Sequence, residues 1–276
     1  MRLFRNMYLK KSGNTFNKIK NPGESFSDKL PVSGLGNWFF CAFWYPKIYF
    51  STFDHNDRNG HNGVKKRRKS PLFIAKDPRG NLISVLNLPR EKLPVLKKSE
   101  YYCPSCHRPV ILKAGTKKLP HFAHKTRCPV KTEGESEIHL LGKKKLYEWL
   151  VSQGIKPEIE KYIREIHQQP DLFFQWNGKN IALEFQCSVI SIREMERRTT
   201  NYLKHGFIPL WILYNERINH RSGILQFNEF LSCFLTKSKT ASPLIISFQP
   251  ETDRFYTYQP IIPFSTNRAC AMKMSF

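Results

Sequence analysis

The sequence has no run of about 18 apolar residues, the length that a helix needs to cross a bilayer. It also has no apolar stretch behind the basic residues at its N-terminus, so we expect no secretory signal. Its 7 cysteines are odd in number and mostly scattered, which argues against a disulfide framework and favours a reducing compartment. Together these absences predict a cytoplasmic protein without a transmembrane segment.

Acidic residues are also scarce. The chain has 22 Asp and Glu against 45 Lys and Arg, which gives a net charge of +23 over 276 residues. Solubility requires much less charge than this. The excess therefore predicts a polyanionic partner, with nucleic acid as the first candidate and an acidic membrane surface as the second. The length of 276 residues is enough for one large or two modest domains, and the apolar content of 40% allows a hydrophobic core.

Residues 1–71 are rich in Asn, Lys, Ser and Gly, which predicts a disordered leader. The basic run at 65–69 could contact nucleic acid or could simply be a linker. The aromatic block at 38–45 is too short to cross a bilayer. We expect it to form a strand or a partner-binding patch.

Residues 72–130 predict a small β-rich module. Apolar runs at 73–75 and 82–86 flank an Asp-Pro-Arg-Gly-Asn turn, as in a hairpin. A second hairpin is expected around the Ala-Gly-Thr turn at 114–116.

A metal knuckle is predicted within this module. Cys103 and Cys106 form a Cys-x-x-Cys pair, and the second hairpin ends in His121 and His124, with Cys128 close behind. Two thiolates with two more Cys or His ligands satisfy tetrahedral Zn²⁺, and a site with four protein ligands is structural. The His-x-x-His spacing is one residue short of the usual range, so His124 with Cys128 is an alternative pair. A redox Cys-x-x-Cys is the rival, but it expects a following helix where this sequence has a strand-like run. A pair that binds no metal is the third interpretation.

Residues 131–214 predict an alternating core. A helix over 136–152 follows a capping box at 132–135, and a strand is expected over 157–163. A second capping box at 191–194 begins another helix, which Gly206 ends, and a buried strand follows over 208–214. We expect the first helix to bury Leu141 and the second to bury Leu203, among other apolar residues.

Between these elements lies an Asn-Gly hairpin over 170–186. Both residues of a two-residue turn must tolerate positive φ, which Asn177 and Gly178 do. This turn places Asp171 directly opposite Glu184, with Gln186 on the same face. Two adjacent carboxylates repel unless a cation lies between them, and Mg²⁺ suits carboxylate oxygens. The alternatives are a solvated face with two ordinary acids, or a register slipped by one residue.

Cationic side chains on the two helices could complete this site. His139 and Lys143 lie four apart on the first helix, where they could form a surface pair or overhang the acids. On the second helix, Arg193, Arg197 and Arg198 are expected to face solvent and to contact nucleic acid. Glu194 and Arg198 are an i,i+4 pair, so Arg198 could instead be only structural.

The predicted order of helix, three strands, helix and strand, with Asp171 and Glu184 on the second and third strands, resembles the PD-(D/E)xK restriction-endonuclease-like nucleases. Over residues 72–230 the sequence is similar, more narrowly, to the competence protein CoiA family. The matching residues are Tyr102 to Cys106, Pro120 to His124, Glu137, His139, Lys143, Asp171, Glu184 to Ser188, Arg198, Tyr202 and Trp211 to Leu213. We therefore expect an α/β (α+β) protein with an αβββαβ core behind the zinc-knuckle module.

The resemblance implies that Asp171 and Glu184 hold Mg²⁺ or Mn²⁺, which activates water for attack on a phosphate. The third position of the motif is usually Lys and is Gln186 here, a departure that the CoiA-like family shares. The candidates for the missing charge are Lys143, His139 and Arg198, and Glu137 is a candidate for a further carboxylate.

The resemblance also implies a role in natural transformation, in which the protein processes incoming DNA beside recombination or competence proteins. The opposed Asp171 and Glu184 favour a deoxyribonuclease. Gln186 favours the alternative, a non-catalytic zinc-containing factor that binds single-stranded DNA and promotes recombination. A protein that binds a membrane surface through its leader is the third hypothesis. For residues 215–276 we expect a packing helix over 225–235, a hairpin that joins 245–248 to 255–258, and a frayed end.

Overall fold

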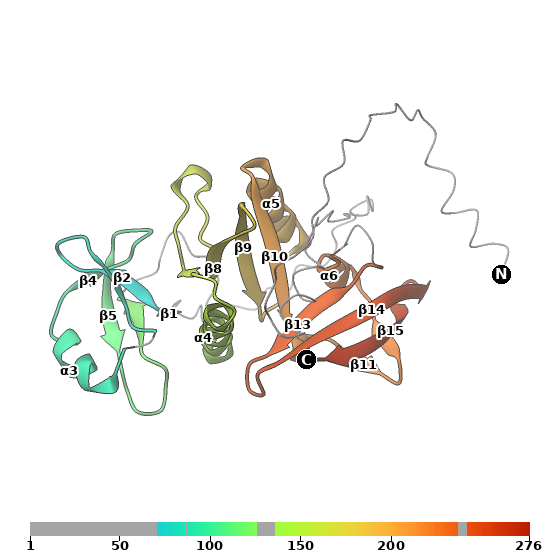
Figure 1. Ribbon diagram of the computed structural model, residues 1–276, viewed down its shortest axis with the longest axis horizontal. Helices are drawn as coiled ribbons and strands as arrows, with labels where there is room; N and C mark the ends of the chain where they lie inside the picture. Colours follow the sequence, from blue (N-terminus) through green and yellow to red (C-terminus); the bar gives the residue numbers. More distant parts are fainter. Residues whose placement is uncertain (1–70, 87, 126–135, 237–241) are drawn as a thin grey trace, which may run out of the picture. The chain divides into compact units, whose positions relative to one another are not determined.

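The described part of the chain contains two β-sheets (Figure 1). This computed structural model describes residues 71–86, 88–125, 136–236 and 242–276. The predicted leader, with its basic run and aromatic block, lies outside these residues except for Pro71, which begins strand β1. The sheets and helices together confirm the mixed α/β class. No helix among the described residues is both long and apolar enough to span a membrane.

The small sheet has six strands in the order β1-β6-β5-β4-β2-β3, and its neighbouring strands pair antiparallel. Both predicted hairpins are present, as β2–β3 and β5–β6. Its elements are β1 (Pro71–Leu72), β2 (Ile74–Lys76), β3 (Leu82–Ser84), β4 (Tyr101–Tyr102), β5 (Pro109–Lys113) and β6 (His121–His124), with the one-turn helix α3 (Leu93–Leu96).

The large sheet has nine strands in the order β11-β12-β15-β14-β13-β10-β9-β8-β7. Strand β10 pairs parallel with both β9 and β13, whereas the other neighbours are antiparallel. The strands are β7 (Glu158–Ile159), β8 (Leu172–Trp176), β9 (Lys179–Gln186), β10 (Phe207–Tyr214), β11 (His220–Arg221), β12 (Ile224–Gln226), β13 (Ile245–Gln249), β14 (Arg254–Ser265) and β15 (Arg268–Ser275). The parallel pairing of β9 and β10 confirms the predicted crossover through the second helix.

Two long helices pack against the centre of the large sheet, α4 (Glu137–Ser152) against β9 and α5 (Ile192–Lys204) against β10 (Figure 1). Each begins at a serine whose hydroxyl accepts a backbone N–H, Ser136 for α4 and Ser191 for α5. The predicted cap at 132–135 lies outside the described residues. The buried stripe of α4 contains Leu140 in place of Leu141, and on α5 Leu203 is 44% exposed. In each case the residue predicted to be buried lies one position along the helix from the buried face, which is about 100° of rotation.

Close packing of α4 on β9 depends on Gly142. A Cβ atom at this position would lie 2.0 Å from Cε1 of Phe185, which projects from β9. The Phe185 ring is buried and lies edge-on to the rings of Tyr214 and Phe248, so it has little room to move. Any side chain at this position must therefore push the helix and the strand apart.

We expect Gly142→Ala to lower the free energy of unfolding by about 1–3 kcal/mol, the usual cost of overpacking a core. This is the reverse of the gain of about 1 kcal/mol that alanine brings in an unobstructed helix. Chemical denaturation measures the effect. Gly115→Ala is the control, because no atom lies within 4 Å of its added Cβ. Equal stability of the two variants would contradict the close approach.

Three expectations for the strands and the C-terminal region were wrong or incomplete. The strand expected over 157–163 ends at Ile159, since Glu160 takes a positive φ of 51°. The helix expected over 225–235 is a strand, β12, followed by the short helix α6 (Glu229–Ser232), whose start is fixed by the side chain of Asn228. The predicted hairpin is β13–β14, but the supposedly frayed end is β15, paired along β14.

Candidate functional site

The Asn-Gly hairpin has the predicted register. Asn177 and Gly178 have φ values of 47° and 71°, as a two-residue turn of this kind requires. Trp176 pairs with Lys179, and the pairing continues to Leu172 opposite Leu183. One step further, the same register places Asp171 opposite Glu184. The slipped register is therefore excluded.

Both carboxylates are buried. Asp171 is 7% exposed and Glu184 is 3% exposed, so they do not lie on a solvated face. Helix α5 covers Glu184, because Tyr202 and Arg198 on this helix both contact its carboxylate. Buried acids need positive charge or hydrogen-bond donors, and the structure supplies both.

Asp171 is held from α4 and from β9. Its Oδ2 atom lies 3.0 Å from Nε2 of His139 and accepts the backbone N–H of Phe185 at 2.9 Å. Its Oδ1 atom lies 3.9 Å from Nζ of Lys143, whose side chain is completely buried. The predicted alternative in which His139 and Lys143 overhang the acids is thus the arrangement observed.

Glu184 is held from α5. Arg198 and the hydroxyl of Tyr202 both donate to its Oε1 atom, the latter at 2.6 Å. The predicted pair between Glu194 and Arg198 is not formed. Glu194 instead accepts two hydrogen bonds from Arg197, at 2.7 and 2.8 Å, so Arg198 is available to the buried acid.

The charge state of Glu184 is finely balanced. Burial raises the pKa of Glu184 to about 7, and the nearby Asp171 adds to the increase, although Arg198 and Tyr202 act in the opposite direction. Burial works against the charge on Arg198 too, but the acids and Tyr202 around it raise its pKa overall. Burial, and then Glu184, raise the pKa of Tyr202 well above its usual value, so its hydroxyl stays a donor. Glu184 is therefore the group of this trio that titrates near neutral pH.

This balance predicts a pH dependence of stability. The pKa of Glu184 is higher in the folded chain, at about 7, than the 4.5 of an unperturbed glutamate. Its contribution is therefore fully present below pH 4.5 and is lost as pH rises through 7. We expect the free energy of unfolding to fall over this window in the wild type and to fall less in Glu184→Gln, whose amide does not titrate. Denaturation at a series of pH values measures this. Glu158→Gln, at an exposed position, should retain the wild-type slope, and the same slope in Glu184→Gln would contradict the assignment.

Gln186 does not act as a cation would. It is buried on β9, two residues after Glu184, and its Nε2 atom donates to the backbone oxygen of Ser188 at 2.7 Å and to the Ser188 hydroxyl at 3.2 Å. The amide is therefore held by its own loop.

Three other predicted residues lie elsewhere. Glu137 forms an ion pair with Lys118, and its side chain is 68% exposed, so its carboxylate is not part of the buried cluster. Arg193 is exposed, as expected. Arg197 is exposed as well, although Glu194 holds it.

Sequence reasoning missed Glu160, which is completely buried just after β7. Its Oε1 atom accepts a hydrogen bond from Lys143 at 2.5 Å. The available signal was weak: an acid that follows Ile159 and precedes Lys161 in the segment predicted as the first strand. Its partners lie far away in the sequence, so no local pattern pointed to them.

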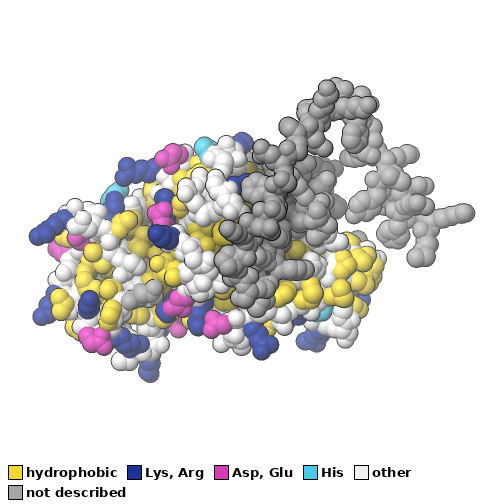
Figure 2. Space-filling model, viewed as in Figure 1, with side chains coloured by type: hydrophobic (Ala, Val, Ile, Leu, Met, Phe, Trp, Pro, Cys, Tyr) yellow, Lys and Arg dark blue, Asp and Glu magenta, His cyan; other side chains and the backbone are white. Residues whose placement is uncertain are grey.

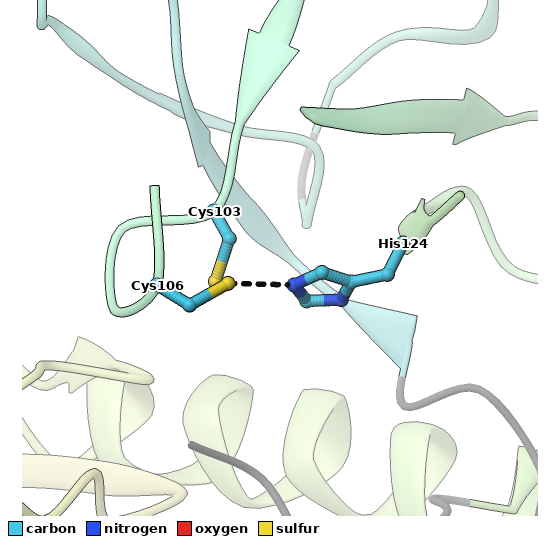
Figure 3. A group of neighbouring side chains, drawn as sticks. All are labelled: Cys103, Cys106 and His124. Atoms are coloured by element: carbon cyan, nitrogen blue, oxygen red, sulfur yellow. Dashed lines mark hydrogen bonds between the residues drawn. The ribbon is translucent and has the colours of Figure 1, made fainter. Parts of the chain in front are cut away.

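A second cluster lies in the small sheet. Cys103, Cys106 and His124 form a group whose ligand atoms all lie within 4.8 Å of one another, and it is the one such group of three among the described residues (Figure 3). The two cysteines lie in the loop after β4, and His124 ends β6 (Figure 3). The Sγ atom of Cys106 lies 3.3 Å from Nε2 of His124. This group could bind a metal ion.

His121, which was predicted to belong to this group, lies outside it. Its Nδ1 atom contacts the backbone oxygen of Leu119 at 2.8 Å, and residues three apart on a strand face opposite sides. The alternative, Cys128, lies outside the described residues. The Nε2 atom of His124 faces Cys106, whereas its Nδ1 atom is buried and has no hydrogen-bond partner among the described residues.

Comparison with known proteins identifies the family. Residues 135–276 match the family described as competence protein CoiA, nuclease-like domain, and residues 85–131 match competence protein CoiA, N-terminal domain. The chain belongs to the CoiA family. Competence protein CoiA from Bacillus subtilis (strain 168) is 36% identical over 177 residues, which cover 63% of this chain and 47% of that protein. The chain thus spans about half the length of this relative, and the buried acids lie within the nuclease-like part of the family match.

Proposed function

We propose that the chain is a metal-dependent nuclease that acts on incoming DNA during natural transformation. The observation that carries this proposal is the buried pair of Asp171, directly before β8, and Glu184, on the neighbouring strand β9, with a cationic side chain close to each acid. The charges are Lys143 beside Asp171 and Arg198 on Glu184. Membership of a family described by competence and by a nuclease-like domain supports the same conclusion.

The acid pair fits Mg²⁺ or Mn²⁺. The contacts of Asp171 with His139 and Phe185 use Oδ2, and those of Glu184 with Arg198 and Tyr202 use Oε1. A hard divalent cation prefers carboxylate oxygens, which Asp171 and Glu184 would supply. Such an ion would activate water and offset the charge that builds on the attacked phosphate.

The protein itself supplies orientation and charge. Tyr202 and Arg198 fix the carboxylate of Glu184. His139 fixes the carboxylate of Asp171 through its Nε2 atom, and an imidazole nitrogen can also accept or release a proton. Gln186 cannot provide the positive charge that lysine gives in related motifs. Lys143, close to Asp171, supplies a positive charge from α4 in its place.

The proposed substrate is DNA, in single-stranded form. The net charge of +23 supports binding to phosphates, which should weaken steeply as salt increases. Lys and Arg side chains are spread over the visible face of the described residues and are not gathered into one patch (Figure 2). This distribution favours contacts with the backbone over recognition of a specific base sequence.

We also propose that the cluster of Cys103, Cys106 and His124 binds Zn²⁺, with Cys128 as the fourth ligand. Two thiolates and one imidazole are a typical donor set for zinc, and four protein ligands make the site structural. Its role would be to hold the small sheet together.

The test of the nuclease proposal uses the pure full chain with labelled single- and double-stranded DNA. Cleavage in Mg²⁺ or Mn²⁺ that stops when a chelator is added supports the proposal. Tight, salt-sensitive binding with no cleavage in either metal would reject it.

The second candidate is a non-catalytic factor that binds single-stranded DNA and promotes recombination. It is favoured by Gln186, whose amide is held by Ser188, and by Arg198, which already neutralises Glu184. Under this alternative, the wild type and variants of the acid pair would bind DNA equally and cut none of it.

A further inference from the structure

Glu160 has a conformation that needs support from its surroundings. It is completely buried, and its φ of 51° lies in the left-handed region that non-glycine residues seldom adopt. Such strain persists only where neighbouring contacts fix the residue in place, and it is concentrated at functional positions. The contacts of Glu160 show what holds it.

The carboxylate of Glu160 joins the small sheet to helix α4. Its Oε2 atom accepts the backbone N–H of Phe73 at 2.9 Å and lies 3.4 Å from that of Ile74, where the chain passes from β1 to β2. Its Oε1 atom accepts a hydrogen bond from Lys143 of α4. One carboxylate therefore binds both parts at once.

The backbone of Glu160 continues the link in two directions. Its N–H donates to the backbone oxygen of Asp171 at 3.0 Å, and its carbonyl accepts a hydrogen bond from the side chain of Gln169. Gln169 in turn accepts a hydrogen bond from the hydroxyl of Ser105 at 3.2 Å. Ser105 lies between the two cysteines of the metal cluster. A second route from the small sheet thus ends at the same residue.

Lys143 depends on this arrangement. Its side chain is completely buried, and a buried ammonium group without a compensating negative charge is strongly destabilising. Glu160 provides that charge at 2.5 Å and leaves the Nζ atom 3.9 Å from Oδ1 of Asp171.

We infer that Glu160 is a positioning residue, which fixes Lys143 beside Asp171 and does so through its bonds to the backbone of the small sheet. The small sheet, which contains the cluster of Cys103, Cys106 and His124, is then linked to the acid site through Glu160. The catalytic consequence rests on the proposed nuclease function, whereas the link between the sheets does not.

The link is tested by amide hydrogen exchange at Phe73 and Ile74. In Glu160→Ala we expect these amides to exchange about tenfold faster or more, since they lose a charged hydrogen-bond acceptor. Glu158→Gln is the control, because it removes the charge of an exposed acid of β7 that pairs with nearby Lys161. Unchanged exchange at Phe73 and Ile74 in Glu160→Ala would overturn the inference.

The positioning role is tested by DNA cleavage and thermal stability, measured on the same variants. Glu160→Gln keeps the size of the side chain but removes its charge. We expect its cleavage to fall roughly 10- to 100-fold, the usual loss when a group that orients a site residue is removed. DNA affinity should be unchanged.

A double variant separates positioning from simple packing. Lys143→Met combined with Glu160→Gln contains no unpaired buried charge, so its thermal stability should recover relative to Glu160→Gln alone. Its cleavage should stay low, because the cation beside Asp171 is gone. Recovery of both stability and cleavage would overturn the positioning role. If the wild-type chain cuts no DNA, both the proposed function and the positioning role are rejected. The exchange rates of the Phe73 and Ile74 amides then still decide whether Glu160 links the small sheet to α4.

Discussion

Asp171→Asn is expected to abolish metal-dependent cleavage of DNA while leaving the fold and DNA affinity in place. Asparagine has the same size and can still accept a hydrogen bond from the backbone of Phe185, but it lacks the charge that a divalent cation requires. We expect the cleavage rate to fall roughly 10³-fold or more, which corresponds to about 4 kcal/mol of lost transition-state stabilisation. Cleavage of labelled single-stranded DNA in Mg²⁺ and Mn²⁺ measures it.

The control is Asp253→Asn, which makes the same chemical change at an exposed carboxylate paired with Lys145. It should cleave and bind DNA as the wild type does. Binding measured in a chelator shows whether Asp171→Asn still holds DNA. If this variant cut DNA at the wild-type rate, the acid pair would not be the catalytic site.

His124→Ala is expected to empty the metal cluster and to unfold the small sheet. Zinc sites of this type contribute about 10–16 kcal/mol of apparent binding free energy, and most of it is folding free energy because the unfolded chain has no site. Elemental analysis should find about one zinc per wild-type chain and none in the variant. Thermal unfolding should occur at a lower temperature, as it should for the wild type in a strong chelator.

His121→Ala is the matched control, because it removes the same type of side chain three residues away on the same strand. Its imidazole contacts a backbone oxygen and lies outside the cluster, so zinc content should be unchanged. Cys128→Ser should lose zinc if Cys128 is the fourth ligand, whereas Cys270→Ser, at an exposed cysteine outside the cluster, should not. Zinc loss in His121→Ala would contradict the assignment.

Local patterns determined the hairpin. The Asn-Gly turn fixed the register, and register fixed which side chains oppose each other, so Asp171 and Glu184 followed by counting. Helix α5 was similarly predictable from Ser191 and from Gly206, which has the positive φ expected after a helix end. In such cases the information lies within a few residues.

The partners of the acids were less accessible to sequence reasoning. Glu194 could pair with Arg197 at i,i+3 or with Arg198 at i,i+4. In the folded chain it pairs with Arg197, and Arg198 contacts Glu184 instead. Glu160 was missed because its partners Phe73 and Lys143 come from two other segments. That His121 and His124 would not both reach the cysteines, by contrast, could have been inferred from the alternation of side chains along a strand.

The contacts around the acid pair differ greatly in sequence separation. The hairpin brings Asp171 to the backbone of Phe185 across 14 residues, whereas Glu160 reaches Phe73 across 87. Closing a longer loop costs more entropy, and contacts between distant residues form more slowly. The two acids should therefore meet early in folding, and the bond from Glu160 to the small sheet should form late. The surroundings of Lys143 should therefore be completed only after the acid pair has met.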